Sequence, residues 1–312
     1  MLFDVAPSHA ALLLRGMRAV AMADGALSAP EREVLDVARE SLGVDPSDVA
    51  LPPLAPDDQA LAGLDARERE QLVQALLLMA VMDGAGARTE AELIEEFARV
   101  LGVDEPRVHN LRQLAEGRFA FMRFDLARKG YFRDELVRTA REEGARGLYM
   151  TFAPLVGLGH DLDVTRRYIA LGELPVGTLG HAYFDFVQSN GLAFPGEGPI
   201  GERGVWHDMI HVVGDYPVTP RGEAEVVAFM AGFRRDDPFF WVFTSVLQFQ
   251  VGVRLSPFSP GVAQQIEPRR YLAHYARGAK VTCDLSADWD FRADLATPLA
   301  EVRARFSVPP RP

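Results

Sequence analysis

The sequence predicts an all-α protein. Apolar residues recur at helical spacing along most of the chain, and no sustained alternation of apolar and polar residues indicates a sheet. The first third repeats a helical-hairpin pattern, and glycine and proline signals divide the remainder into helices of ordinary length. A chain of 312 residues exceeds the usual size of one core. We therefore expect two helical domains, at residues 1–117 and 118–312, with fraying at 308–312.

The internal repeat organises the predicted N-terminal domain. Residues 19–45 read AVAMADGALSAPEREVLDVARESLGVD, and residues 79–104 read MAVMDGAGARTEAELIEEFARVLGVD. Each copy has an apolar helical segment, Asp-Gly, a short turn, Glu seven residues after the Asp, an amphipathic helix and a closing Leu-Gly-Val-Asp. The apolar face of the second helix in the later copy should comprise Leu93, Phe97, Val100 and Leu101. The repeat thus predicts two helical hairpins.

The repeated Asp-Gly-x5-Glu pattern matches the latter half of an EF-hand calcium loop. The earlier loop positions, however, hold Val20 and Met22 in one copy and Met79 and Val81 in the other, which offer no oxygen ligands. The simpler interpretation is a glycine-assisted helix end followed by an acidic helix start. A weak cation site remains the alternative, and its residues would be Asp24, Glu31, Asp83 and Glu90.

This duplicated pattern resembles the TerB family of helical domains associated with tellurite resistance. The resemblance covers residues 10–115 approximately, and it places the acidic positions of the family on the same four residues of the weak cation site.

Composition limits the partners that the protein can have. Lys and Arg number 33 against 44 Asp and Glu, giving a net charge of -11 without a basic stripe, so nucleic acid is not an expected partner. Cys283 is the single cysteine and cannot form an internal disulfide, which favours the cytoplasm. No secretory signal is visible, and no apolar stretch is long enough to span a bilayer. Any contact with the inner face of a membrane would be peripheral, and we expect no nucleotide cofactor.

The strongest chemical motif is His-Asp-x-x-His followed by a distal Glu. His207 and His211 are four residues apart, so on a helix they project from one face about one turn apart. Asp208 can flank that face as a ligand or as a hydrogen-bond partner. Thr219 and Pro220 suit the start of a returning helix, whose Glu223 can approach the two histidines. Such donors suit zinc or another first-row divalent metal.

Spacing alone leaves two interpretations equally open: a metal site, or histidines that are solvated or bonded to carbonyl groups. A phosphohydrolase of the HD type would need further His and Asp ligands, and His160-Asp161 is the only other His-Asp pair. That third interpretation is therefore disfavoured.

The complete motif resembles the signature of the fourth Coq protein family of ubiquinone (coenzyme Q) biosynthesis. The chain has H-D-x-x-H, eleven residues and Glu without an insertion, and it keeps Gly214 and Pro217 in the intervening loop. Residues 174–192 and 271–306 are also similar to segments of the family, so the resemblance covers most of residues 120–310.

The resemblance implies one divalent metal, zinc or iron, bound by His207, Asp208, His211 and Glu223. It also implies a polyprenylated aromatic substrate and oxidative decarboxylation, in which a hydroxyl replaces the carboxyl at ring C1. The fused N-terminal domain and the residues inside the motif depart from the family pattern, so the resemblance supports the metal ligands more directly than the substrate. The alternative is a non-catalytic scaffold that binds prenyl lipid and presents quinone intermediates to other enzymes.

A prenyl tail needs a long apolar groove, and an aromatic-rich stretch follows the motif directly. The residues expected to line such a groove are Phe229, Phe233, Phe240 and Trp241. The same stretch equally suits an ordinary aromatic core or the face of a homodimer.

Overall fold

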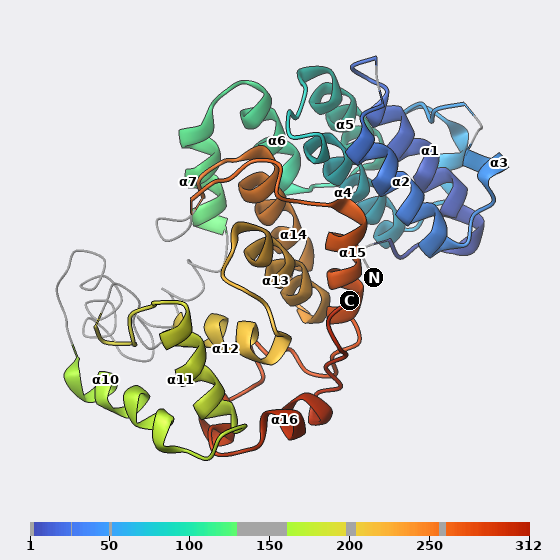
Figure 1. Cartoon of the computed structure of the whole chain (residues 1–312). Coiled ribbons are helices and arrows are strands. Elements are labelled where there is room, and N and C mark those ends of the chain that lie inside the picture. Colours follow the sequence, from blue (N-terminus) through green and yellow to red (C-terminus); the bar gives the residue numbers. More distant parts are fainter. Residues whose placement is uncertain (1–2, 26, 50–51, 130–160, 198–203, 256–259) are drawn as a thin grey trace. The chain divides into compact units, whose positions relative to one another are not determined.

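The computed structural model describes residues 3–25, 27–49, 52–129, 161–197, 204–255 and 260–312. Within these ranges the secondary structure is helical, and no strand occurs apart from an isolated β-bridge between Thr178 and Pro298 (Figure 1). The predicted all-α class is confirmed for this part of the chain. His160, of the disfavoured His-Asp pair, lies outside it.

The chain divides into two compact units. Unit 1 comprises Met1–Leu126 and Asp237–Ala273, and unit 2 comprises Ala127–Asp236 and His274–Pro312. The sequence predicts a single domain boundary near residue 117, whereas unit 1 also includes residues 237–273. The division into domains at residue 117 stays a prediction. Helices α7 and α15 each continue from one unit into the other.

Unit 1 is built around helix α4. Its α-helices are α1 (Ala10–Ala21), α2 (Ala29–Leu42), α3 (Pro46–Val49), α4 (Ala66–Met82), α5 (Arg88–Leu101), α6 (Pro106–Ala115), α7 (Phe119–Lys129), α14 (Pro238–Val246) and the start of α15 (Pro268–Gly278). The shorter segments are η1 (Pro7–His9), η2 (Gln59–Gly63) and the π-helical η6 (Leu247–Val251). Helix α4 packs against α1, α2, α5, α6, α14 and η6, and its residues from Leu72 to Met82 are accordingly buried on every side.

The two predicted hairpins are α1–α2 and α4–α5. Ser28 caps α2, and Gly43, with a φ of 65°, ends it in the left-handed conformation. The expected apolar face of α5 is partly wrong, because Val100 is 44% exposed whereas Ile94 is fully buried. The buried stripe of α5 is Ala91, Ile94, Phe97, Ala98 and Leu101.

Unit 2 holds the motif helices. Its elements are α10 (Leu162–Ile169), η4 (Ala170–Glu173), α11 (Leu179–Ser189), α12 (Val205–Gly214), α13 (Pro220–Phe233), the end of α15, η7 (Phe291–Asp294) and α16 (Leu299–Arg305). Helix α12 packs against α11, α13 and α16. Helices α13 and α15 approach backbone to backbone, since a Cβ at Gly278 would lie 1.9 Å from the carbonyl oxygen of Phe229.

Residues 308–312 do not fray as expected. The Nε of Arg277 donates to the carbonyl oxygen of Pro309 at 2.8 Å, and Arg311 Nη2 donates to Glu225 Oε2 at 2.9 Å. These contacts attach the segment after α16 to unit 2.

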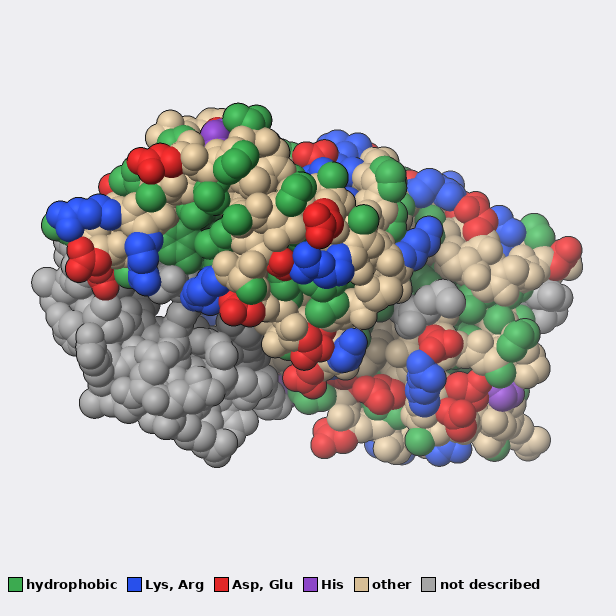
Figure 2. Space-filling model, turned by 90° about the horizontal axis from the view of Figure 1, so that it is seen from below, with side chains coloured by type: hydrophobic (Ala, Val, Ile, Leu, Met, Phe, Trp, Pro, Cys, Tyr) green, Lys and Arg blue, Asp and Glu red, His purple; other side chains and the backbone are tan. Residues whose placement is uncertain are grey.

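Acidic and basic side chains are interspersed on the surface that Figure 2 presents, and no large basic patch gathers there. This distribution agrees with the excess of 44 acidic over 33 basic residues in the sequence.

Candidate metal centre

Helix α12 brings two imidazole rings together. His207 and His211 lie one turn apart, and their Nε2 atoms are 3.2 Å from each other. The side chain of His211 is 1% exposed and that of His207 is 32% exposed. The pair therefore has one buried member and one that solvent can reach.

Glu223 completes the cluster from helix α13. Thr219 caps this helix by accepting a hydrogen bond from the backbone N–H of Gly222, and Pro220 takes the first helical position. As a result Glu223 Oε2 lies 3.4 Å from His207 Nε2, and Glu223 Oε1 lies 3.3 Å from His211 Nε2. One ligand atom from each of the three residues lies within 4.8 Å of the other two. The returning helix predicted from the sequence is confirmed.

Hydrogen bonding orients the buried imidazole. His211 Nδ1 lies 3.1 Å from the carbonyl oxygen of Tyr216, and a carbonyl can only accept, so Nδ1 carries the proton. Nε2 then faces Glu223: while it carries a proton it donates to that carboxylate, and once it loses the proton its lone pair is available to a metal ion.

The charges in the cluster favour an ionised carboxylate. Burial alone would raise the pKa of Glu223, but hydrogen bonds and charges from His207 and His211 more than offset it, so this pKa lies well below the usual range. Burial acts in the opposite direction on His207 and lowers its pKa. The hydrogen bond and charge of Glu223, with the charge of Asp208, more than offset this, so the pKa of His207 lies above its ordinary value. Two imidazoles and one carboxylate within binding distance of a common point fit zinc or another first-row divalent ion, with positions left for water or substrate.

Asp208, the fourth predicted ligand, does not belong to this group of three. Burial raises its pKa, which the charges of His207 and His211 oppose. It interacts with Tyr183, a fully buried residue of α11 whose own pKa is raised by burial and by the nearby carboxylate. The role of Asp208 as a ligand stays a prediction.

Sequence spacing did not identify the residues that are linked to His211 through Tyr216. The hydroxyl of Tyr216 lies 2.9 Å from His274 Nδ1, and His274 Nε2 lies 3.4 Å from Glu225 Oε2. Tyr216 supports His211 through a backbone carbonyl, which any residue type could provide, so no side-chain signal was available. His274 packs in the core, as expected for a structural histidine.

The acidic residues of the repeat are electrostatically coupled in unit 1. Glu31 and Glu90 are 2% and 1% exposed, and each carboxylate accepts the backbone N–H of the residue three positions earlier. Burial raises the pKa of Glu90 to about 8, and the charges of Asp83, Glu31 and Asp24 add to the shift. The acidic helix start is confirmed, whereas a cation site at these four residues stays a prediction.

The aromatic residues expected to line a lipid groove fall into both units. Phe229 and Phe233 lie in unit 2, are 0% and 5% exposed, and pack edge to face with centroids 5.4 Å apart. Phe240 and Trp241 lie in unit 1, and their ring centroids are 5.8 Å apart. The first pair thus has a packing role, and the groove stays a prediction.

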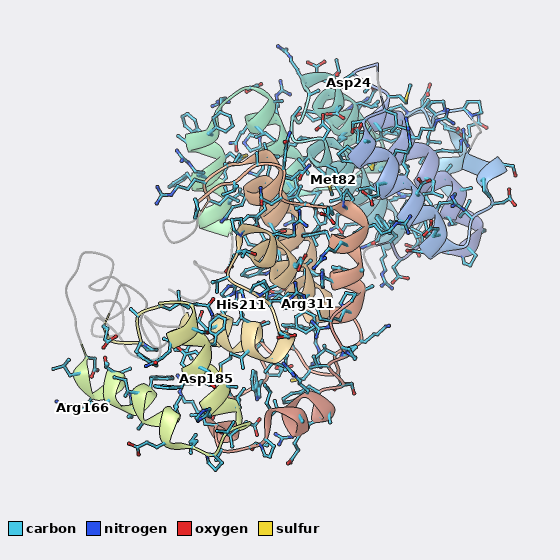
Figure 3. All side chains as sticks on the ribbon, in the orientation of Figure 1. Asp24, Met82, Arg166, Asp185, His211 and Arg311 are labelled. Atoms are coloured by element: carbon cyan, nitrogen blue, oxygen red, sulfur yellow. The ribbon has the colours of Figure 1, made fainter. Side chains whose placement is uncertain are left out.

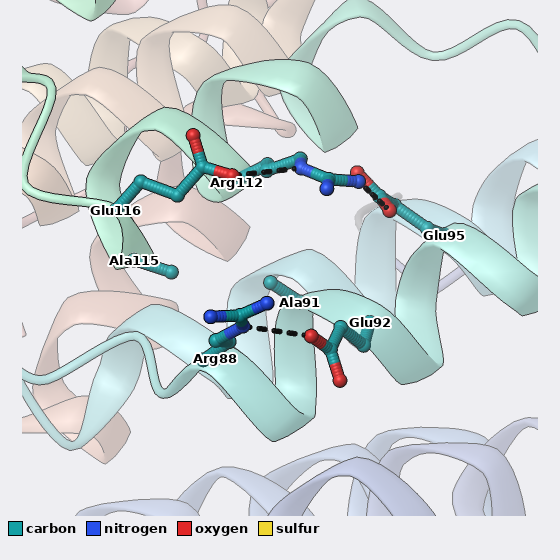
Figure 4. A pocket seen from close by; sticks show the side chains of 7 residues that line it. All are labelled: Arg88, Ala91, Glu92, Glu95, Arg112, Ala115 and Glu116. Carbon is teal, nitrogen blue, oxygen red and sulfur yellow. Dashed lines mark hydrogen bonds and ion pairs between the residues drawn. The ribbon is translucent and has the colours of Figure 1, made fainter.

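A shallow pocket in unit 1 lies between α5 and α6 (Figure 4). It is lined by Arg88, Ala91, Glu92, Glu95, Arg112, Ala115 and Glu116. Arg88 pairs with Glu92 at 2.8 Å, and Arg112 pairs with Glu95 at 2.6 Å. These surface ion pairs satisfy the charges that line it, so this pocket offers no chemistry comparable to that of the histidine cluster.

No protein-family model matches the chain, and no curated protein matches it. Among the helices described, none is both long and apolar enough to cross a membrane.

Proposed function

We propose that the protein is a metal-dependent enzyme that acts on a lipophilic aromatic acid, with a prenylated hydroxybenzoate as the preferred substrate class. The observation that carries the proposal is the convergence of His207, His211 and Glu223 from two helices of unit 2. The resemblance of the motif to the fourth Coq protein family supplies the substrate class and the reaction type.

The proposed reaction replaces the ring carboxyl by a hydroxyl. The bond between the ring and the carboxyl carbon breaks, carbon dioxide leaves, and one oxygen atom of dioxygen forms the new hydroxyl. A two-electron donor and two protons convert the second oxygen atom to water, and a third proton converts the new ring oxygen to the hydroxyl, which balances the atoms and charges for a substrate bound as the carboxylate. A divalent ion bound at the cluster would act as a Lewis acid toward the substrate carboxylate.

The residues of the chain have separate parts in this proposal. The Nδ1 proton of His211 is held by the carbonyl oxygen of Tyr216. This leaves Nε2 as the nitrogen whose lone pair can bind the metal ion. Glu223 brings the negative charge that favours a divalent cation over a neutral ligand. His207, which is partly exposed, marks the side from which substrate can approach.

The test is turnover by the full-length protein. Metal-free protein is loaded with Zn²⁺ or Fe²⁺ and supplied with a prenylated 4-hydroxybenzoate, dioxygen and a chemical reductant, and released carbon dioxide and hydroxylated product are measured. We expect product with at least one of the metals and none with the His211→Ala variant. Full activity of His211→Ala would refute the role of the cluster.

A second outcome would support the scaffold alternative. If prenyl lipid copurifies with the protein and no product forms under any combination of metal, reductant and dioxygen, the proposed reaction is wrong and a lipid-presenting role is favoured. Equal amounts of lipid on the wild-type protein and on His211→Ala would then place the lipid away from the metal cluster.

A further inference from the structure

We infer that Arg277, Arg303 and Arg311 are positioning residues for the metal centre. They hold the C-terminal end of α12 and the loop that follows it, and so fix Glu223 opposite the two histidines. The inference rests on the proposed metal-dependent function, which it extends to residues outside the His-Asp-x-x-His motif. Figure 3 marks His211 and Arg311 within unit 2.

The last carbonyl groups of a helix have no partner within the helix itself. In α12 these groups are satisfied from distant parts of unit 2. Arg303 donates from Nη2 to the carbonyl oxygen of Val212 at 3.0 Å and from Nε to that of Val213 at 2.9 Å. Arg277 Nη1 donates to the carbonyl oxygen of Gly214 at 2.8 Å. The two guanidinium groups also place positive charge at the negative end of the helix dipole.

The turn toward Glu223 is held in the same way. Asp215 has a φ of 61°, a left-handed conformation that non-glycine residues rarely adopt, and Arg311 Nη1 donates to its carbonyl oxygen at 3.0 Å. Arg277 Nη1 also donates to the hydroxyl of Tyr216 at 2.8 Å. Tyr216 carries the carbonyl that orients His211, so Arg277 reaches a ligand through one intervening residue.

A buried carboxylate ties Arg311 in place. Glu225, on α13 two residues after Glu223, is 2% exposed and accepts from Arg311 Nη2 at 2.9 Å. One arginine therefore contacts both the loop that leaves α12 and the helix that carries the third ligand. This arrangement couples the end of α12 to the start of α13.

Charge and geometry make opposite predictions for the removal of an arginine. If the guanidinium acted only through its charge, its loss would reduce repulsion and a divalent cation would bind more tightly. If it acts by positioning, its loss lets the loop and Glu223 move and the cation binds more weakly. The sign of the change in affinity therefore separates the two effects.

The experiment titrates Co²⁺ into metal-free, full-length protein and follows the visible absorption of bound Co²⁺, which reports both affinity and coordination geometry. Arg303→Ala should weaken binding about tenfold, the lower end of the range for residues that hydrogen-bond a metal ligand directly, because Arg303 acts through the backbone of α12. It should also alter the absorption spectrum. Arg303→Lys should recover only part of the loss, because a single ammonium group cannot hold both carbonyls as the guanidinium fork does.

Arg305→Ala is the matched control. Arg305 lies on the same helix and pairs with the buried Asp294 at 2.7 Å, and its hydrogen bonds do not go to the end of α12. Its loss should lower thermal stability and leave Co²⁺ affinity unchanged. If Arg303→Ala does not fold, Arg303→Lys and Arg311→Ala are compared with the same control.

Two results would overturn the inference: Co²⁺ binding by the arginine variants as tight as that of the wild type or tighter, or an equal loss in Arg305→Ala. A wild-type protein that binds no Co²⁺ would refute both this inference and the metal premise of the proposed function. A wild-type protein that binds Co²⁺ without turning over substrate would refute the proposed reaction alone, since the relative affinities would still decide the positioning role.

Discussion

Glu31 and Glu90 occupy the same place in the two copies of the internal repeat. Each lies near the start of its helix, each accepts a backbone N–H at 2.7 or 2.8 Å, and each is almost completely buried. Their negative charges also act on one another, because the charge of Glu31 raises the pKa of Glu90. A fold that buries two interacting carboxyls must respond to pH.

The first prediction is that unit 1 loses stability as the pH rises toward 8. The ordinary pKa of Glu90 is 4.5, and burial and neighbouring charges raise it to about 8 in the folded protein. Because the folded pKa is the higher one, the stabilisation is complete below pH 4.5 and is lost as the pH rises through 8. Each pH unit in this window costs up to about 1.4 kcal/mol from this group.

Thermal unfolding between pH 5 and pH 8.5, in buffer with a chelator, measures the effect. Glu90→Gln keeps the hydrogen bond to the backbone and cannot ionise, so we expect a flatter pH profile and a higher Tm at pH 8. Glu92→Gln, on the exposed side of the same helix, should leave the slope unchanged. If Glu90→Gln keeps the wild-type slope, Glu90 is not the group responsible.

The sequence predicted features that depend on local spacing. The four-residue interval between His207 and His211 places both rings on one face of any helix, and Thr219-Pro220 is a local start signal that the structure reproduces. The acidic start of α2 was likewise a local prediction, and in the structure Glu31 forms a capping box with Ser28.

Features that depend on tertiary packing were not predictable from these patterns. Ile94 and Val100 are both apolar residues of α5, and only the neighbouring helices determine that Ile94 is buried and Val100 is exposed. The three positioning arginines are separated from α12 by many residues and bind backbone carbonyls, which leave no signature in the sequence. The grouping of residues 237–273 with the N-terminal part of the chain has the same origin.

The second prediction separates the ligands. Glu223 lies within 3.4 Å of both histidine Nε2 atoms, whereas Asp208 is outside the group of three and interacts with Tyr183. Glu223→Gln should therefore weaken Zn²⁺ binding at least about a hundredfold, more than the loss of a residue that only supports a ligand. Asp208→Asn should weaken it less, and calorimetric titration of metal-free protein measures both.

Two other outcomes of that titration have distinct meanings. Equal losses in the two variants would show that Asp208 moves onto the metal when it binds, as the family resemblance implies. An unchanged affinity in Glu223→Gln would contradict the cluster as the binding site.

The third prediction concerns the cap of α13. Thr219 accepts a hydrogen bond from the N–H of Gly222 at 3.1 Å and so fixes the first turn of the helix that carries Glu223. Thr219→Ala should lower the free energy of unfolding of unit 2 by about 1 kcal/mol. It should also weaken metal binding, while Thr219→Ser, which keeps the hydroxyl, should change neither. A Ser variant as impaired as the Ala variant would argue against the capping role.

The fourth prediction uses the close contact between α13 and α15. Gly232 lies inside α13, where alanine has the better helix propensity by about 1 kcal/mol. A Cβ at this position, however, would lie 2.2 Å from the carbonyl oxygen of Tyr275 and 2.8 Å from the carbonyl carbon of Gly278. These are backbone atoms that cannot rotate away, so the helices must separate. Gly232→Ala should therefore destabilise unit 2 by about 2 to 3 kcal/mol, as is typical of overpacking.

Gly16→Ala provides the contrast in unit 1. Gly16 is also inside a helix, but the nearest atoms to its Cβ would be side-chain methyl groups of Leu72 and Leu76, at 2.9 and 3.3 Å. Flexible side chains can shift at little cost, so this substitution should change stability much less than Gly232→Ala does. Denaturant unfolding of both variants measures the difference. If Gly232→Ala instead raises stability by the amount that helix propensity predicts, α13 and α15 are not in backbone contact at Gly232.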